Sequence, residues 1–89
     1  MKDVIHFNRE TSIYFESKED ENRMFLRYTE LCMNDYLVNR GYVYLNQIYD
    51  NLGVRWDPQR DNPCCIYSGT PIKFVIQGLG DNFKIGISW

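Results

Sequence analysis

The sequence lacks several features that mark particular classes of protein. No apolar run approaches the ~20 residues needed to cross a bilayer, and the first residues contain no apolar signal-peptide segment. The 3 cysteines, two of them adjacent, do not form the even-numbered framework of a disulfide-stabilised secreted domain. We therefore expect a single domain over residues 1–89 that has no membrane association and is made and kept in a cytosol.

Residue types that bind metals or perform catalysis are also few. The one histidine, His6, lies in a predicted strand with no orienting carboxylate nearby in sequence. Zinc ligands normally occur in pairs two to four residues apart, and adjacent cysteines rarely bind one ion together. The sequence thus predicts no catalytic activity, no cofactor and no metal. It leaves open whether Cys64 and Cys65 are free thiols or a vicinal disulfide.

The charge balance gives no indication of a polyanionic partner. The 10 basic and 12 acidic residues leave a formal charge of -2, whereas proteins that bind nucleic acid through bulk charge are basic. Aromatic residues, by contrast, make up 16% of the chain and include 7 tyrosines. Tyrosine combines a large ring with a polar hydroxyl, so this excess fits either a partner-binding surface or a small core with few aliphatic residues.

The first half of the chain is predicted to form two strands and then a long helix. Beta-branched and aromatic residues on both sides of a polar break predict a hairpin over residues 4–16. Ser17 and Asp20 then have the spacing of a capping box, with acidic residues in the first turn. Nothing interrupts the helix before Gly41, so it is expected to run for about 22 residues.

This helix has two apolar faces. The broader face consists of Met24, Phe25, Tyr28, Leu31, Cys32, Tyr36 and Val38. The narrower face, almost opposite, consists of Leu26, Met33 and Leu37. Such a helix is either buried on two sides, or buried on one side and bound to a partner on the other.

The second half of the chain predicts a short helix and a C-terminal hairpin. Gly41 and Gly53 stand where left-handed caps would end the two helices. A proline-containing loop over residues 54–63 follows, and alternating apolar residues then predict an antiparallel hairpin over Ile72–Trp89. The expected fold is α+β, with one long and one short helix packed on a small, mainly antiparallel sheet.

The corner that holds the short helix carries a family resemblance. Its residues are Gly41, Tyr42, Val43, Leu45, Asn46, Tyr49, Asp50, Leu52 and Gly53. They resemble the GYVSLNDLYDxLGL-like corner of a family of small uncharacterised proteins from phages and mobile elements of Gram-positive bacteria. The chain departs from it at Tyr44, where the family has a serine suited to capping, so Asn46 is expected to serve as the cap. The resemblance implies a phage or mobile-element origin and an α+β fold, and it implies no reaction.

These features favour a protein that acts by binding another protein. The predicted surface combines the narrower helix face with the loop, and consists of Leu26, Met33, Leu37, Arg55, Trp56 and Arg60. Tryptophan and arginine are frequent at interface hot spots, and a homodimer would need only one such apolar face. The expected partner is a host or phage protein or a second copy, and inhibition of a host defence system is one expected role.

The alternative is a DNA-binding regulator of winged-helix type. A long helix, a glycine corner, a short helix and a hairpin fit that arrangement. The helix that would read DNA, over residues 44–52, has no lysine or arginine and contains Asp50. Because base and phosphate contacts depend on basic residues, the sequence favours protein binding.

Overall fold

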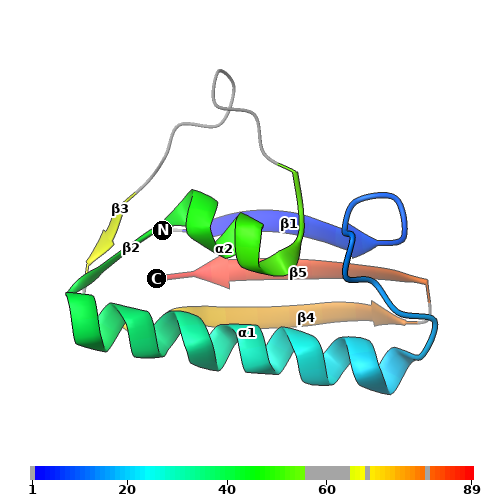
Figure 1. Cartoon of the computed structure of the whole chain (residues 1–89), viewed down its shortest axis with the longest axis horizontal. Helices are drawn as coiled ribbons and strands as arrows, with labels where there is room; N and C mark the ends of the chain where they lie inside the picture. The colour runs from blue at the N-terminus through cyan, green and yellow to red at the C-terminus, as the bar shows by residue number, and fades with distance from the viewer. Residues whose placement is uncertain (1, 56–64, 68, 80) are drawn as a thin grey trace.

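The computed structural model describes residues 2–55, 65–67, 69–79 and 81–89, and in them two helices and five strands. In chain order these are β1 (Lys2–Asn8), α1 (Glu19–Arg40), β2 (Tyr42–Tyr44), α2 (Leu45–Leu52), β3 (Cys65–Tyr67), β4 (Lys73–Leu79) and β5 (Asn82–Ser88). Both helices lie on one side of the larger sheet (Figure 1). Within the described ranges, neither helix is long and apolar enough to span a bilayer.

The larger sheet contains three antiparallel strands in the order β1-β5-β4. The predicted C-terminal hairpin is confirmed, because β4 pairs with β5 from Lys73 opposite Ser88 to Leu79 opposite Asn82. β1 pairs with the other edge of β5 over its whole length. The last strand of the chain is therefore the central strand of this sheet.

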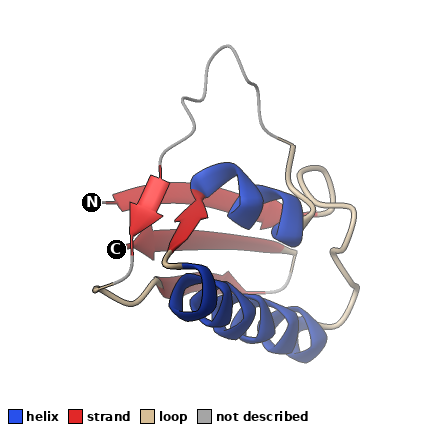
Figure 2. Cartoon of the chain, turned by 60° about the vertical axis from the view of Figure 1, so that its left-hand side comes forward, coloured by secondary structure: helices blue, strands red, loops and turns tan. Residues whose placement is uncertain are grey.

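Alternation along the strands gives the sheet one apolar face and one polar face. The buried side chains of the apolar face are Ile5, Phe7, Phe74, Phe83, Ile85 and Ile87. The helices form a second layer over this face (Figure 2) and add Leu26, Met33, Leu37, Ile48 and Leu52 to the core. The expected α+β arrangement is thus confirmed.

The predicted N-terminal hairpin is wrong. Its first strand exists as β1, but residues 13–15 form turns and irregular backbone. The polar residues after β1 form a local turn, in which the Thr11 hydroxyl accepts a hydrogen bond from the backbone N–H of Asn8 at 2.9 Å. β1 pairs with β5 instead because that register places Ile5 and Phe7 in the core.

The predicted cap at Ser17 is also wrong. Helix α1 begins at Glu19, and Lys18 before it makes no side-chain capping bond. Asn22, inside the first turn, anchors the incoming chain instead. Its buried amide group accepts a hydrogen bond from the backbone N–H of Glu16 and donates one to the backbone C=O of Glu16, both at 2.9 Å.

The predicted left-handed caps at the ends of the two helices are confirmed. Gly41 and Gly53 have φ of 85° and 70° and end α1 and α2 in the left-handed conformation. At the start of α2, Gln47 Oε1 accepts the backbone N–H of Tyr44 at 2.9 Å. The expected cap by Asn46 is wrong, because the N-cap is Tyr44, two residues earlier, and Asn46 lies within the first turn of α2.

The corner between the helices also contains a short two-stranded sheet, which was not predicted from the sequence. β2 pairs with β3 antiparallel, with Val43 opposite Ile66. Both side chains are buried in the core. This small sheet therefore ties the segment after residue 64 to the end of α1.

Candidate protein-binding surface

One side of α1 exposes large apolar side chains to solvent. Along this side lie Met24, Tyr28, Leu31, Asp35 and Val38, here called the outer face. The exposed fractions are 72% for Met24, 65% for Tyr28, 60% for Leu31 and 79% for Val38. Single exposed apolar residues are normal on a protein surface, but four along one side of a helix, interrupted only by Asp35, are typical of a binding site.

The outer face has the spacing of a helix-pairing surface. Its members follow one another at intervals of four, three, four and three residues, which is the spacing of the apolar a and d positions in the seven-residue repeat. From Met24 to Val38 the row is about 21 Å long, at 1.5 Å per residue. Such a row matches the surface that one helix presents to another.

Polar side chains on one flank of α1 fix the rotation of this helix. Arg27 Nη1 donates a hydrogen bond to the C=O of Phe74 at 3.0 Å, and Glu30 Oε2 accepts the N–H of Phe74 at 2.6 Å. The Asn34 amide accepts the N–H of Ile72 at 2.8 Å and donates to the C=O of Ile72 at 2.9 Å. These bonds cover the outer edge of β4, which would otherwise present unpaired backbone groups. They leave the outer face of α1 turned away from the sheet.

The structure corrects the predicted use of the narrower helix face. Leu26, Met33 and Leu37 are 0%, 1% and 3% exposed and belong to the core, so no partner can reach them in this fold. The physical reason lies in the polar flank of α1, which consists of Arg27, Glu30 and Asn34. Because these side chains bond to the backbone at the edge of β4, the narrower face packs on the sheet and most of the broader face is exposed to solvent.

The predicted loop residues are described only in part. Arg55 is exposed and lines a cleft of about 490 Å³ with residues 9–13, Gly53 and Val54. Trp56 and Arg60 lie outside the described residues. The cleft is formed by the turn after β1 and the segment that ends α2, and α1 contributes nothing to its lining.

The tyrosine excess lies at the surface. The tyrosines that are at least 39% exposed are Tyr14, Tyr28, Tyr36, Tyr42, Tyr44 and Tyr67. This distribution favours the partner-surface interpretation of the composition over the core interpretation. On the outer face, a hydrogen-bonding interaction with the Cys32 side chain raises the pKa of Tyr28, and the Asp35 carboxylate adds a smaller contribution.

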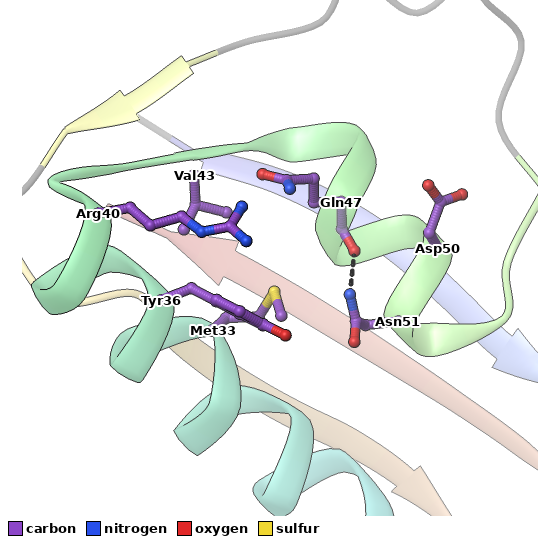
Figure 3. A pocket seen from close by; sticks show the side chains of 7 residues that line it. All are labelled: Met33, Tyr36, Arg40, Val43, Gln47, Asp50 and Asn51. Atoms are coloured by element: carbon purple, nitrogen blue, oxygen red, sulfur yellow. Dashed lines mark hydrogen bonds between the residues drawn. The ribbon is translucent and has the colours of Figure 1, made fainter.

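A small pocket lies between the C-terminal half of α1 and α2 (Figure 3). Its volume of about 180 Å³ is below the range of about 300–1,000 Å³ that is common for small-molecule sites. Arg40 lies over the ring of Tyr36 at 4.9 Å from its centroid on one side of the pocket, and Asp50 and Asn51 line the side formed by α2. The pocket is large enough for one side chain of a partner and too small for most metabolites.

The solvent-facing side of the larger sheet is basic. Its residues are Lys2, Val4, His6 and Asn8 from β1, Asn82, Lys84, Gly86 and Ser88 from β5, and Lys73, Val75 and Gln77 from β4. This set, here called the open sheet face, contains three lysines and no acidic residue. The strand register places Lys2 and Lys73 on either side of Ser88, so the positive charge extends across all three strands.

Metal-binding geometry is absent from the residues that the structure describes. They contain no group of three or more His, Cys, Asp or Glu residues that could hold an ion. His6 is exposed on the open sheet face, and Cys32 is a partly buried free thiol. Cys64, and with it the state of the adjacent cysteine pair, lies outside the described ranges.

Comparison with known proteins does not assign the chain to a family. No family model matches it, and no curated protein or solved structure is significantly similar to it. The fold and its surfaces are therefore the basis for the function proposed next.

Proposed function

We propose that this protein acts by binding another protein, with the outer face of α1 as the binding surface. The observation that carries the proposal is the row of apolar side chains that are 60–79% exposed along one side of the helix. Burying such a side chain contributes about 1.5–3 kcal/mol. At this spacing, the complementary surface is a helix that is apolar except for a hydrogen-bond donor opposite Asp35.

The sequence resemblance supports a phage or mobile-element setting for this activity. In that setting the partner would be a protein of the bacterial host, met in the cytosol. Capture of a host defence protein would inhibit it without any catalytic step, since occupying the target's own binding surface is sufficient.

Capture of host proteins by the tagged chain tests the proposal. Replacing Leu31 and Val38 together with glutamate should preserve the fold, because both side chains are at least 60% exposed. The same change should abolish capture, because an apolar partner helix cannot pair the new charges. Captured proteins are identified by mass spectrometry.

The matched control is Lys84→Glu on the open sheet face. It changes the net charge by the same two units as the double substitution on the outer face, but at a different surface. The proposal requires loss of the captured protein with the outer-face variant and its retention with Lys84→Glu. The opposite result would contradict it.

Nucleic-acid binding is a second candidate function, favoured by the basic open sheet face. Helix α2, which would read DNA in a winged-helix protein, exposes Asp50 and Asn51 and has no lysine or arginine. Lys2, Lys73 and Lys84 instead offer phosphate contacts across the sheet. The residues that define the open sheet face include no phenylalanine, tyrosine or tryptophan for base stacking, so binding there would depend mainly on the nucleic-acid backbone and not on sequence.

Charge reversal at Lys73 and Lys84 tests this second candidate. If the open sheet face binds nucleic acid, the affinity for a single-stranded oligonucleotide should fall as the salt concentration rises. The logarithm of the association constant, plotted against the logarithm of the salt concentration, should have a slope of about -0.7 per phosphate contact. Replacing both lysines with glutamate should weaken binding at least tenfold at low salt, measured by fluorescence anisotropy. Affinity that is independent of salt and of both lysines would eliminate this function.

A further inference from the structure

We propose that, when no other protein is bound, a second copy of the chain covers the outer face of α1. The two α1 helices would run antiparallel about a two-fold axis at Leu31. This inference rests on the proposed function in that it uses the same binding surface. A two-fold dimer requires one self-complementary patch, and the outer face has that property.

The spacing along the outer face is symmetric about Leu31 to within one residue. Met24 lies seven residues before it and Val38 seven residues after it, while Tyr28 lies three before and Asp35 four after. Antiparallel pairing therefore brings Leu31 against its own copy, Met24 against Val38, and Tyr28 against Asp35. The mismatch in the last pair is one residue, or about 1.5 Å along the helix, which a tyrosine side chain can span.

Asp35 determines both the occupant and the direction of pairing. It is the only charged residue of the outer face. In a parallel pair the two Asp35 carboxylates would face each other, and like charges in an interface are unfavourable. A wholly apolar partner would leave the carboxylate without a donor. Antiparallel pairing places the Tyr28 hydroxyl opposite Asp35 twice per dimer, and a hydroxyl that donates to a carboxylate forms a charge-assisted hydrogen bond.

The position of α1 in the fold allows this approach. The helix forms one border of the molecule (Figures 1 and 2), and its outer face is opposite to the side that packs on the sheet. A second copy can therefore align along α1 without displacing the bonds between α1 and the edge of β4. Because the contact is limited to one helix from each copy, we expect a weak, concentration-dependent dimer that a protein partner can displace.

Two substitutions of Tyr28 test the pairing. Tyr28→Lys places a positive charge opposite Asp35 of the second copy, whereas Tyr28→Glu places a negative charge there. Both remove the same ring from the same exposed position. The dimer dissociation constant, from sedimentation equilibrium, should be at least tenfold higher for Tyr28→Glu than for Tyr28→Lys. Equal constants, or a wild-type chain that stays monomeric up to millimolar concentration, would overturn the proposal.

Cysteine crosslinking tests the direction, in a background in which Cys32, Cys64 and Cys65 are replaced by serine. Under mild oxidation Leu31→Cys should form a disulfide-linked dimer with itself. Met24→Cys should crosslink when mixed with Val38→Cys and not with itself. Crosslinking of Met24→Cys with itself would indicate a parallel pair and refute the antiparallel register.

The dimer and the proposed function can fail separately. A monomeric wild-type chain whose host capture still depends on Leu31 and Val38 would reject the dimer and keep the proposed function. A dimer that depends on Tyr28 and Asp35, with host capture unaffected by the outer face, would support the dimer and reject the proposed function.

Discussion

Replacing Met33 with aspartate is expected to unfold the domain, whereas Leu31→Asp, two residues away on the same helix, should leave it folded. The Met33 side chain is 1% exposed and belongs to the core, while Leu31 is 60% exposed. An unpaired carboxylate in a core costs about 3–5 kcal/mol, which approaches the lower end of the stability of a small domain, about 5–15 kcal/mol. At an exposed helix position the same change costs less than about 1 kcal/mol.

The free energy of unfolding of both variants is measured by urea denaturation, with circular dichroism as the signal. A single low protein concentration should be used, because binding of a second copy adds to the apparent stability of the folded state. The assignment of the two faces of α1 would be reversed if Leu31→Asp unfolded the domain and Met33→Asp did not. Equal, small effects would mean that neither face is part of a tightly packed core.

This pair of positions also shows what the sequence can and cannot predict. Both faces of α1 are apolar, so hydrophobic spacing alone does not indicate which one is buried. The deciding contacts join α1 to backbone groups about forty residues later in the chain, such as the pair Asn34 and Ile72. The regular spacing of the outer face is visible in the sequence, but only the fold shows that it is exposed.

The reliable predictions were those that depend on local chemistry. The C-terminal hairpin follows from strict alternation of apolar residues in β5, and the helix ends follow from the freedom of Gly41 and Gly53 to adopt positive φ. The N-terminal hairpin failed because β1 pairs with β5 at the far end of the chain, for example Asn8 with Asn82. No local signal distinguishes a neighbouring partner strand from a distant one.

Replacing Asn34 with leucine is expected to destabilise the domain by about 2 kcal/mol, because the backbone N–H and C=O of Ile72, directly before β4, lose their partners. Leucine is similar in size and favours the helix, so the change isolates the amide. Asn34 both accepts the N–H of Ile72 and donates to its C=O. These bonds also protect an edge strand that could otherwise pair with another molecule, so the variant should aggregate more readily near its unfolding midpoint.

The matched control is Asn39→Leu, which makes the same replacement at an exposed position of α1. Its free energy of unfolding, from urea denaturation, should change by less than about 0.5 kcal/mol.

Amide hydrogen exchange adds a local measurement. In Asn34→Leu the amide of Ile72 should lose protection, while the amide of Phe74 should keep it because Glu30 still accepts that N–H. Equal losses of stability in the two variants, or equal loss of protection at Ile72 and Phe74, would mean that Asn34 does not hold the edge of β4. The orientation of α1 about its axis would then depend on Arg27 and Glu30, which bond to the backbone of Phe74.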